Sequence, residues 1–245
     1  MKRFRTAGLL WIVMIITLIV VGLVFKDTGL HQLPFFTKVI SQEIICFLIV
    51  YILNKVWSRQ TVHFISPVRL RNQLSVVWPL ILILLFFDIS VLTIGPAFKG
   101  VVINIITVLL IGIFEEYLSR GVLFTLFLTD LNGRSHGLLR ATVFSSLLFS
   151  LSHLINLSHQ GFGVTLLQLG FAFAFGFLLC GVYYKTGSLI WPILIHAMND
   201  FIGFNTHPTT SLQLSSTVVW VQLTEIIVIF VLALYVFSRH NKITI

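Results

Sequence analysis

The stretch Gly112-Ile113-Phe114-Glu115-Glu116-Tyr117-Leu118-Ser119-Arg120-Gly121 places two adjacent glutamates and an arginine inside an apolar run. An ionised side chain at bilayer depth costs roughly 2.5–3.5 kcal/mol, even on insertion-based scales. A chain keeps such groups where they pair tightly or serve a function. This run is therefore the first place in the sequence to look for chemistry.

The chain as a whole has the composition of a membrane protein. Of its 245 residues, 57% are hydrophobic and 10% are charged, whereas soluble domains carry roughly 25% charged residues. The net charge of +8 does not indicate nucleic-acid binding, because the basic residues are not clustered with interleaved aromatic residues. We expect an all-α polytopic protein in a lipid bilayer, with no nucleic-acid partner.

The apolar segments and the charges between them predict the topology. A helical span needs about 20 apolar residues, and the sequence offers eight such segments, at about 7–25, 39–57, 76–95, 101–128, 141–157, 163–184, 188–205 and 217–238. With a cytoplasmic N-terminus, twelve Lys and Arg residues fall on the inside and three on the outside, and Arg120 lies within a span. This bias follows the positive-inside rule. It predicts about eight transmembrane helices, with both termini cytoplasmic and the protein multi-pass in the cell membrane.

The charged residues of the central run have different expected partners. Glu116 and Arg120 are four residues apart on one helix face, so we expect an ion pair that supports the site. Glu115 is rotated by about 100° from Glu116 and has no local cation, so it should face a polar cavity and suits a general base. Glu43 and Glu225 lie nearer the outer ends of their spans, where snorkelling to the interface or a hydrogen bond explains them.

Two later apolar stretches each contain a histidine, Phe149-Ser-Leu-Ser-His153 and His196-Ala-Met-Asn199-Asp200. Asp200 follows His196 by four residues, so its carboxylate can hold the imidazole tautomer or stabilise the protonated ring. Glu115, His153 and His196 all fall at mid-membrane depth in the predicted spans. They can converge if these spans pack together.

Motifs of other intramembrane enzymes, such as the His-Glu-x-x-His pattern of zinc proteases, are absent from the sequence. The three motifs that are present are Glu115-Glu116-x-x-x-Arg120, Phe149-x-x-x-His153 and His196-x-x-x-Asp200. In this order they resemble the signature of the CAAX prenyl protease and bacteriocin-processing family, also called the Abi family. The resemblance covers about residues 110–205.

This resemblance implies a glutamate-dependent intramembrane endopeptidase that works without a cofactor or a metal. Glu115 and His153 would activate the hydrolytic water, and His196 with the residue at position 200 would stabilise the oxyanion. The supporting residues would be Glu116, Arg120 and Phe149, the last packing beside the site.

One position departs from the pattern, because Asp200 stands where many members of that family have Asn. An ionised Asp cannot donate a hydrogen bond to an oxyanion. Asp200 is therefore protonated, or it orients His196, or a water or Asn199 supplies the donor. Glu115, His153, His196 and Asp200 could also form a zinc site, so metal-dependent hydrolysis stays an alternative.

The sequence thus predicts three regions: transmembrane helices one to three in residues 1–98, a catalytic core of helices four to seven in 99–205, and helix eight in 206–245. The expected partner is a membrane-associated peptide or protein substrate, in bacteriocin-like peptide processing or self-immunity. The alternatives are a non-catalytic immunity or scaffold protein that binds a peptide or receptor, and a proton-coupled transporter. The sequence does not indicate an oligomeric state.

Overall fold

The computed structural model describes residues 2–93, 98–206 and 215–239, and the regular secondary structure of these ranges is entirely helical. The α-helices are α1 (Lys2–Asp27), α2 (Phe35–Leu53), α3 (Leu70–Thr93), α4 (Phe98–Glu116), α5 (Thr125–Asp130), α6 (Gly137–Ser152), α7 (Phe162–Thr186), α8 (Ile190–Thr206) and α9 (Ser216–Ser238). Two π-helical segments, η2 (Asn54–Ser58) and η3 (Tyr117–Phe124), extend α2 and α4. The 3₁₀ segments are η1 (Gly29–Gln32) and η4 (His153–Ser158).

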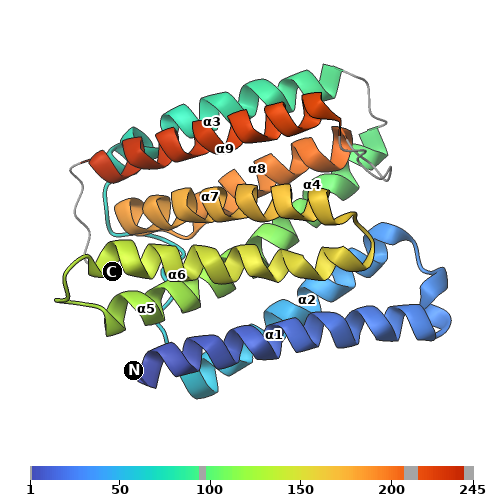
Figure 1. The fold of residues 1–245 in the computed structure, drawn as a ribbon, viewed down its shortest axis with the longest axis horizontal. Helices are drawn as coiled ribbons and strands as arrows, with labels where there is room; N and C mark the ends of the chain where they lie inside the picture. Colours follow the sequence, from blue (N-terminus) through green and yellow to red (C-terminus); the bar gives the residue numbers. More distant parts are fainter. Residues whose placement is uncertain (1, 94–97, 207–214, 240–245) are drawn as a thin grey trace.

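The helices lie roughly along one axis (Figure 1), with α1 and α2 at one edge of the bundle and α3 and α9 at the other. The middle is filled by α4, α6, α7 and α8, because α4 packs against α2 and α8 while α7 packs against α6 and α9. The motif-bearing helices α4, α6 and α8 are therefore enclosed by the other helices of the bundle.

Helix length and composition agree with a multi-pass membrane protein. Among the described residues, six helical stretches are long and apolar enough to cross a membrane, namely Lys2–Asp27, Phe35–Ser58, Gly100–Asp130, Gly137–Ser158, Phe162–Thr186 and Ser216–Ser238. Two shorter apolar stretches, Leu70–Phe86 and Ile190–Phe204, correspond to the predicted third and seventh spans. The last two residues of the predicted third span, 94–95, lie outside the described ranges. The all-α prediction is confirmed, while the count of eight spans and the three-region division stay predictions.

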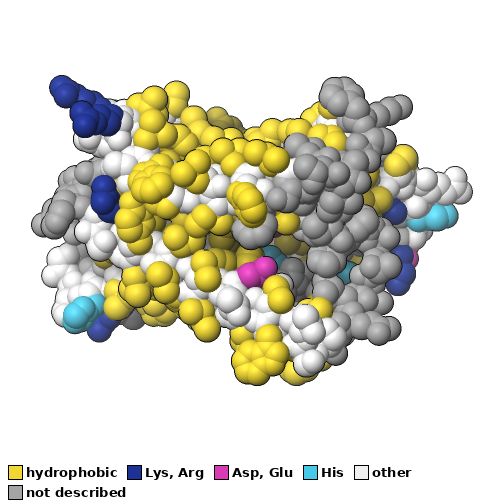
Figure 2. Space-filling model, turned by 90° about the horizontal axis from the view of Figure 1, so that it is seen from above, with side chains coloured by type: hydrophobic (Ala, Val, Ile, Leu, Met, Phe, Trp, Pro, Cys, Tyr) yellow, Lys and Arg dark blue, Asp and Glu magenta, His cyan; other side chains and the backbone are white. Residues whose placement is uncertain are grey.

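The surface has the pattern that a bilayer requires. Figure 2 shows hydrophobic side chains across the middle of one face, with Lys and Arg side chains toward the two ends. The beginning of α1 and the end of α9 lie at the same end of the bundle (Figure 1). This arrangement agrees with an even number of crossings, and the cytoplasmic location of that end stays a prediction.

Side-chain hydrogen bonds hold α6 against its neighbours beside the motifs. The Ser145 hydroxyl donates to the Ser119 carbonyl of η3 over 2.8 Å, and the Ser150 hydroxyl donates to the Leu169 carbonyl of α7 over 2.7 Å. In an apolar environment, such hydrogen bonds between helices stabilise close packing. They set the position of α6 relative to the two helices that it contacts.

Candidate active site

A change in helix geometry follows the glutamate pair directly. Glu115 and Glu116 end α4, and the chain continues without a break into the π-helix η3, which contains Arg120. All eight residues of η3 are buried. The wider turns of a π-helix are rare in proteins, and where they occur they often lie at functional sites. The predicted span at 101–128 is present as one continuous helical stretch, but nothing in its hydrophobic pattern indicated the π segment.

The predicted ion pair between Glu116 and Arg120 is confirmed. Arg120 Nη1 lies 2.5 Å from Glu116 Oε1, and both side chains are fully buried. The Arg120 guanidinium also lies over the Phe149 ring, 4.4 Å from its centroid. A buried ion pair needs such additional partners, because attraction between the two charges alone does not always offset their desolvation.

Glu116 also holds the imidazole of His196. His196 Nδ1 lies 2.7 Å from Glu116 Oε1, the same oxygen that accepts from Arg120. A carboxylate that already pairs with Arg120 can only accept, so Nδ1 carries the proton. From its spacing, Asp200 was expected to hold this ring or to stabilise its protonated form. In the structure Glu116 accepts from Nδ1, because α4 packs directly against α8, and Asp200 faces the other ring nitrogen.

The second ring nitrogen of His196 faces two further carboxylates. Its Nε2 lies 3.5 Å from Asp200 Oδ2 and 3.7 Å from Glu115 Oε2. The Glu115 side chain is 27% exposed and the Asp200 side chain 21%, whereas Glu116 is completely buried. The rotation between adjacent helical residues predicted that the two glutamates face different surroundings. Glu116 points into the packed core, and Glu115 lies at a more open side of the His196 ring.

His153 and His196 share an aromatic neighbour, the Phe149 ring. His153 follows the last residue of α6, and its Nδ1 is 3.1 Å from the Phe149 carbonyl, which leaves Nε2 as the nitrogen that can act as a base. The Phe149 ring centroid is 5.2 Å from the His153 ring and 5.9 Å from the His196 ring, edge-on to both. His153 also interacts electrostatically with His196 and Asp200.

Two site neighbours come from helices that carry no motif. The Phe175 ring of α7 packs edge-on against His196, with 5.5 Å between the ring centroids. Glu43 of α2 is only 6% exposed and interacts electrostatically with Glu115 and Asp200. The sequence offered snorkelling or a hydrogen bond for Glu43; the buried side chain does not fit snorkelling, and a hydrogen bond with Gln42 fits the second explanation.

Asn199 adjoins the site beside Asp200. Its Nδ2 donates to Asp200 Oδ1 over 3.4 Å. Asn199 and Phe175 also line a cavity of about 850 Å³ between α3, α7, α8 and α9. Of the three possibilities for position 200, this geometry agrees best with an orienting Asp200, since both of its oxygens face donors or the imidazole ring.

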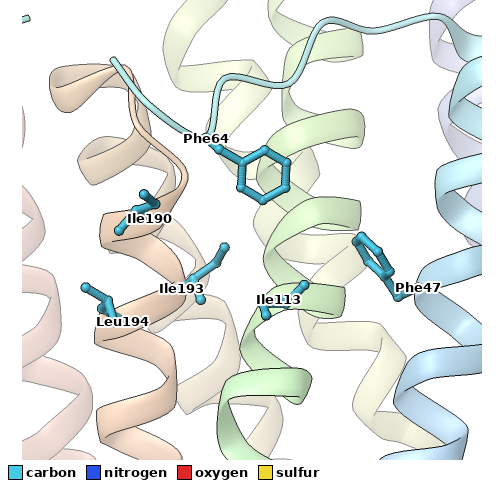
Figure 3. Close-up of a pocket in the computed structure, with 6 residues that line it drawn as sticks. All are labelled: Phe47, Phe64, Ile113, Ile190, Ile193 and Leu194. Carbon is cyan, nitrogen blue, oxygen red and sulfur yellow. The ribbon is translucent and has the colours of Figure 1, made fainter. Parts of the chain in front are cut away.

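A smaller, wholly hydrophobic pocket lies between α2, α4, α8 and the connection at 59–69. It has a volume of about 480 Å³ and is shown in Figure 3, with side chains from all four segments around it. Its lining residues are Phe47, Phe64, Ile113, Ile190, Ile193 and Leu194. Ile193 precedes His196 by three residues, so the two share a face of α8, whereas Ile113 and Glu115, two residues apart, point to different sides of α4.

The described part of the chain contains no set of side chains arranged as ligands for the zinc site that the sequence left open. Within those residues, no three His, Cys, Asp or Glu side chains are arranged to hold a metal ion. The two ring nitrogens of His196 instead face carboxylates. Nδ1 makes one hydrogen bond to Glu116, and Nε2 makes longer contacts with Glu115 and Asp200.

The closeness of α7 to the ion pair gives a stability prediction. A Cβ added at Gly176 would lie 3.1 Å from Arg120 Nη2, 3.2 Å from the Phe149 ring and 3.3 Å from the Ser146 backbone. Gly176→Ala should therefore lower the free energy of unfolding by about 1–3 kcal/mol through overpacking, measured by thermal melting in detergent. Gly8→Ala is the control, because a Cβ there meets nothing within 4 Å. Equal melting of the two variants would contradict this packing.

A protein-family model matches part of the chain. Residues 96–202 match the model of a family described as type II CAAX prenyl endopeptidase Rce1-like. No curated protein and no solved structure matches the chain. The matched range contains all three motifs and confirms the resemblance that they indicated.

Proposed function

We propose, because residues 96–202 match the family model described as type II CAAX prenyl endopeptidase Rce1-like, that the protein is an intramembrane endopeptidase of the cell membrane. It hydrolyses a peptide bond of a membrane-associated peptide or protein. The observation that carries this proposal is the setting of His196, whose Nδ1 is held by Glu116 and whose Nε2 faces the partly exposed carboxylates of Glu115 and Asp200.

Glu115 is the general base in this proposal. Its partly exposed carboxylate takes a proton from water, and the resulting hydroxide attacks the peptide carbonyl. His153, whose ring also contacts Phe149, assists in orienting the water through its Nε2. Glu115 then returns the proton to the leaving amine, so that the cleaved bond yields a carboxylic acid and an amine.

His196 stabilises the oxyanion that forms on the peptide carbonyl. Carboxylate oxygens of Glu115, Glu116 and Asp200 lie within 3.7 Å of its ring nitrogens, an arrangement that stabilises the imidazolium form. This form carries a proton on Nε2, which can be donated to the oxyanion. Asp200 acts as an orienting acceptor for the ring, and Asn199 adds an amide donor beside it.

The apolar pocket beside the site supports a hydrophobic substrate. Leu194 lines this pocket and is 37% exposed. Leu194→Trp should raise KM by about tenfold and change kcat much less, because it fills a space that we assign to an apolar substrate group. Leu223→Trp on α9, at a similarly exposed leucine (38%), is the control. A change confined to kcat would show that the pocket does not bind substrate.

The proposal is tested by comparing the peptides in membranes of cells that express the native chain, Glu115→Gln or Glu225→Gln at matched levels. Glu225 is an exposed glutamate of α9, so its variant removes one carboxylate from a helix that carries none of the three motifs. We expect new peptide ends with the native chain and with Glu225→Gln, but not with Glu115→Gln. Identical peptide sets, with the biological effect retained in all three, would instead favour the non-catalytic immunity or scaffold function.

A further inference from the structure

Trp11 of α1 is hydrogen-bonded to the last turn of α6, from a helix that lies outside the matched range 96–202. Its Nε1 donates to the Leu148 carbonyl over 2.8 Å and to the Ser152 hydroxyl over 2.9 Å. The Ser152 hydroxyl in turn donates to the Leu148 carbonyl over 3.0 Å. An N–H group in an apolar medium needs such a partner. Each of these two acceptor residues also directly precedes a residue of the candidate site, which gives the contact a second consequence.

The backbone changes from an α-helix to a 3₁₀ helix at the turn that Trp11 contacts. α6 ends at Ser152, and η4 begins at His153. The His153 backbone N–H bonds to the Ser150 carbonyl, three residues back, whereas an α-helical bond would go to the Phe149 carbonyl, four residues back. The Phe149 carbonyl instead accepts from His153 Nδ1 over 3.1 Å. The change of helix type therefore sets which nitrogen of this imidazole carries the proton.

Helical rotation places the contact with α1 and the site residues on different faces of this turn. Leu148 and Ser152 are four residues apart and share a face of α6, which is the face that Trp11 contacts. Phe149 and His153 each follow by one residue, a rotation of about 100°. The Phe149 ring lies edge-on to both site histidines. A turn that is held on the first face therefore also holds the Phe149 carbonyl and the His153 ring in place.

We infer that Trp11 is a positioning residue of the proposed reaction: its N–H holds the last turn of α6, and this turn keeps His153 in the orientation and tautomer that direct Nε2 to the water. The inference rests on the proposed endopeptidase function. Trp11 acts through His153 and not on the substrate. The inference thus gives α1, which lies outside the matched range 96–202, a part in forming the site.

The first test compares native protein with Trp11→Phe and with a replacement of Trp11 by benzothienylalanine, which keeps the shape of tryptophan but has no N–H. We expect both changes to lower kcat by about tenfold and to leave KM unchanged, because a small displacement of a group that orients the water slows the reaction. Trp78→Phe is the control, since Trp78 is an exposed tryptophan of α3. It should cleave the peptide at the native rate.

The second test asks whether Trp11 acts through His153. In a double-mutant cycle, adding Trp11→Phe to His153→Ala should lower kcat no further, because the residue that Trp11 positions is already gone. Nitrogen NMR of protein labelled at histidine gives a readout that needs no activity, and the His153 signal is assigned by its absence from His153→Ala. The native ring should show the Nδ1–H tautomer, whereas both changes at Trp11 should give a mixture of the two tautomers.

Three results would overturn the inference. They are a native kcat after both changes at Trp11, an equal further loss of kcat when Trp11→Phe is added to His153→Ala, and an unchanged His153 tautomer. A lower melting temperature with an unchanged tautomer would assign Trp11 to folding alone. In all of these cases, cleavage that depends on Glu115 would leave the endopeptidase function standing. Absence of any cleavage that depends on Glu115 would instead refute the function, and the inference with it.

Discussion

Glu115→Gln should lower kcat for peptide cleavage by about 10²–10⁴-fold, the usual contribution of a general base. The amide has nearly the same shape as the carboxylate but cannot take a proton from water. Because the Glu115 side chain is 27% exposed and makes its contact with His196 at 3.7 Å, its neutralisation should leave the fold intact. The measurement is kcat on a cleaved peptide, with purified protein in detergent.

Glu225→Gln provides the matched control for this experiment, since it is the same substitution at an exposed position on α9. It should cleave the peptide at the native rate. If both variants melt at the same temperature as the native protein, the loss of activity in Glu115→Gln comes from the missing base and not from unfolding. A Glu115→Gln variant with native kcat would remove Glu115 from the mechanism.

Arg120→Met should lower the free energy of unfolding by about 3–5 kcal/mol, because it leaves a buried glutamate without its cation. Arg120 and Glu116 are both fully buried, and methionine fills the core without a charge. The measurement is thermal melting in detergent together with the folded yield. An Arg120→Met variant that melts like native protein would show that the pair contributes little to stability.

The double variant Glu116→Gln/Arg120→Met separates stability from chemistry. It removes both charges, so it should melt at a higher temperature than Arg120→Met. It should nevertheless cleave poorly, because Glu116 Oε1 also accepts the hydrogen bond from His196 Nδ1. A stable double variant with native activity would show that the hydrogen bond from His196 to Glu116 is not needed to hold the imidazole.

Local patterns in the sequence predicted the features that depend on neighbouring residues. The apolar segments gave helices at the expected positions. The four-residue spacing of Glu116 and Arg120 gave their ion pair, and that of His196 and Asp200 gave a contact of 3.5 Å. Such spacings follow from the helical period alone. The rotation between adjacent residues likewise predicted that Glu115 and Glu116 face different surroundings.

Contacts between distant segments could not be predicted in this way. Glu116 and His196 are 80 residues apart, and only the packing of α4 against α8 brings them together. The same holds for Phe175, which lies in a phenylalanine-rich stretch without a distinguishing signal. For Glu43, the sequence indicated a position near the outer end of its span, but whether its side chain is buried depends on how α2 packs.

The most direct test of the central claim is hydrolysis by purified protein in lipid vesicles, in water enriched in heavy oxygen. If Glu115 activates water, native protein and Glu225→Gln should cleave the peptide and place heavy oxygen in the new carboxyl end, as read by mass spectrometry. Glu115→Gln should leave the peptide intact. A peptide that stays intact with native protein, or one that is cleaved equally by Glu115→Gln, would contradict a glutamate-dependent endopeptidase.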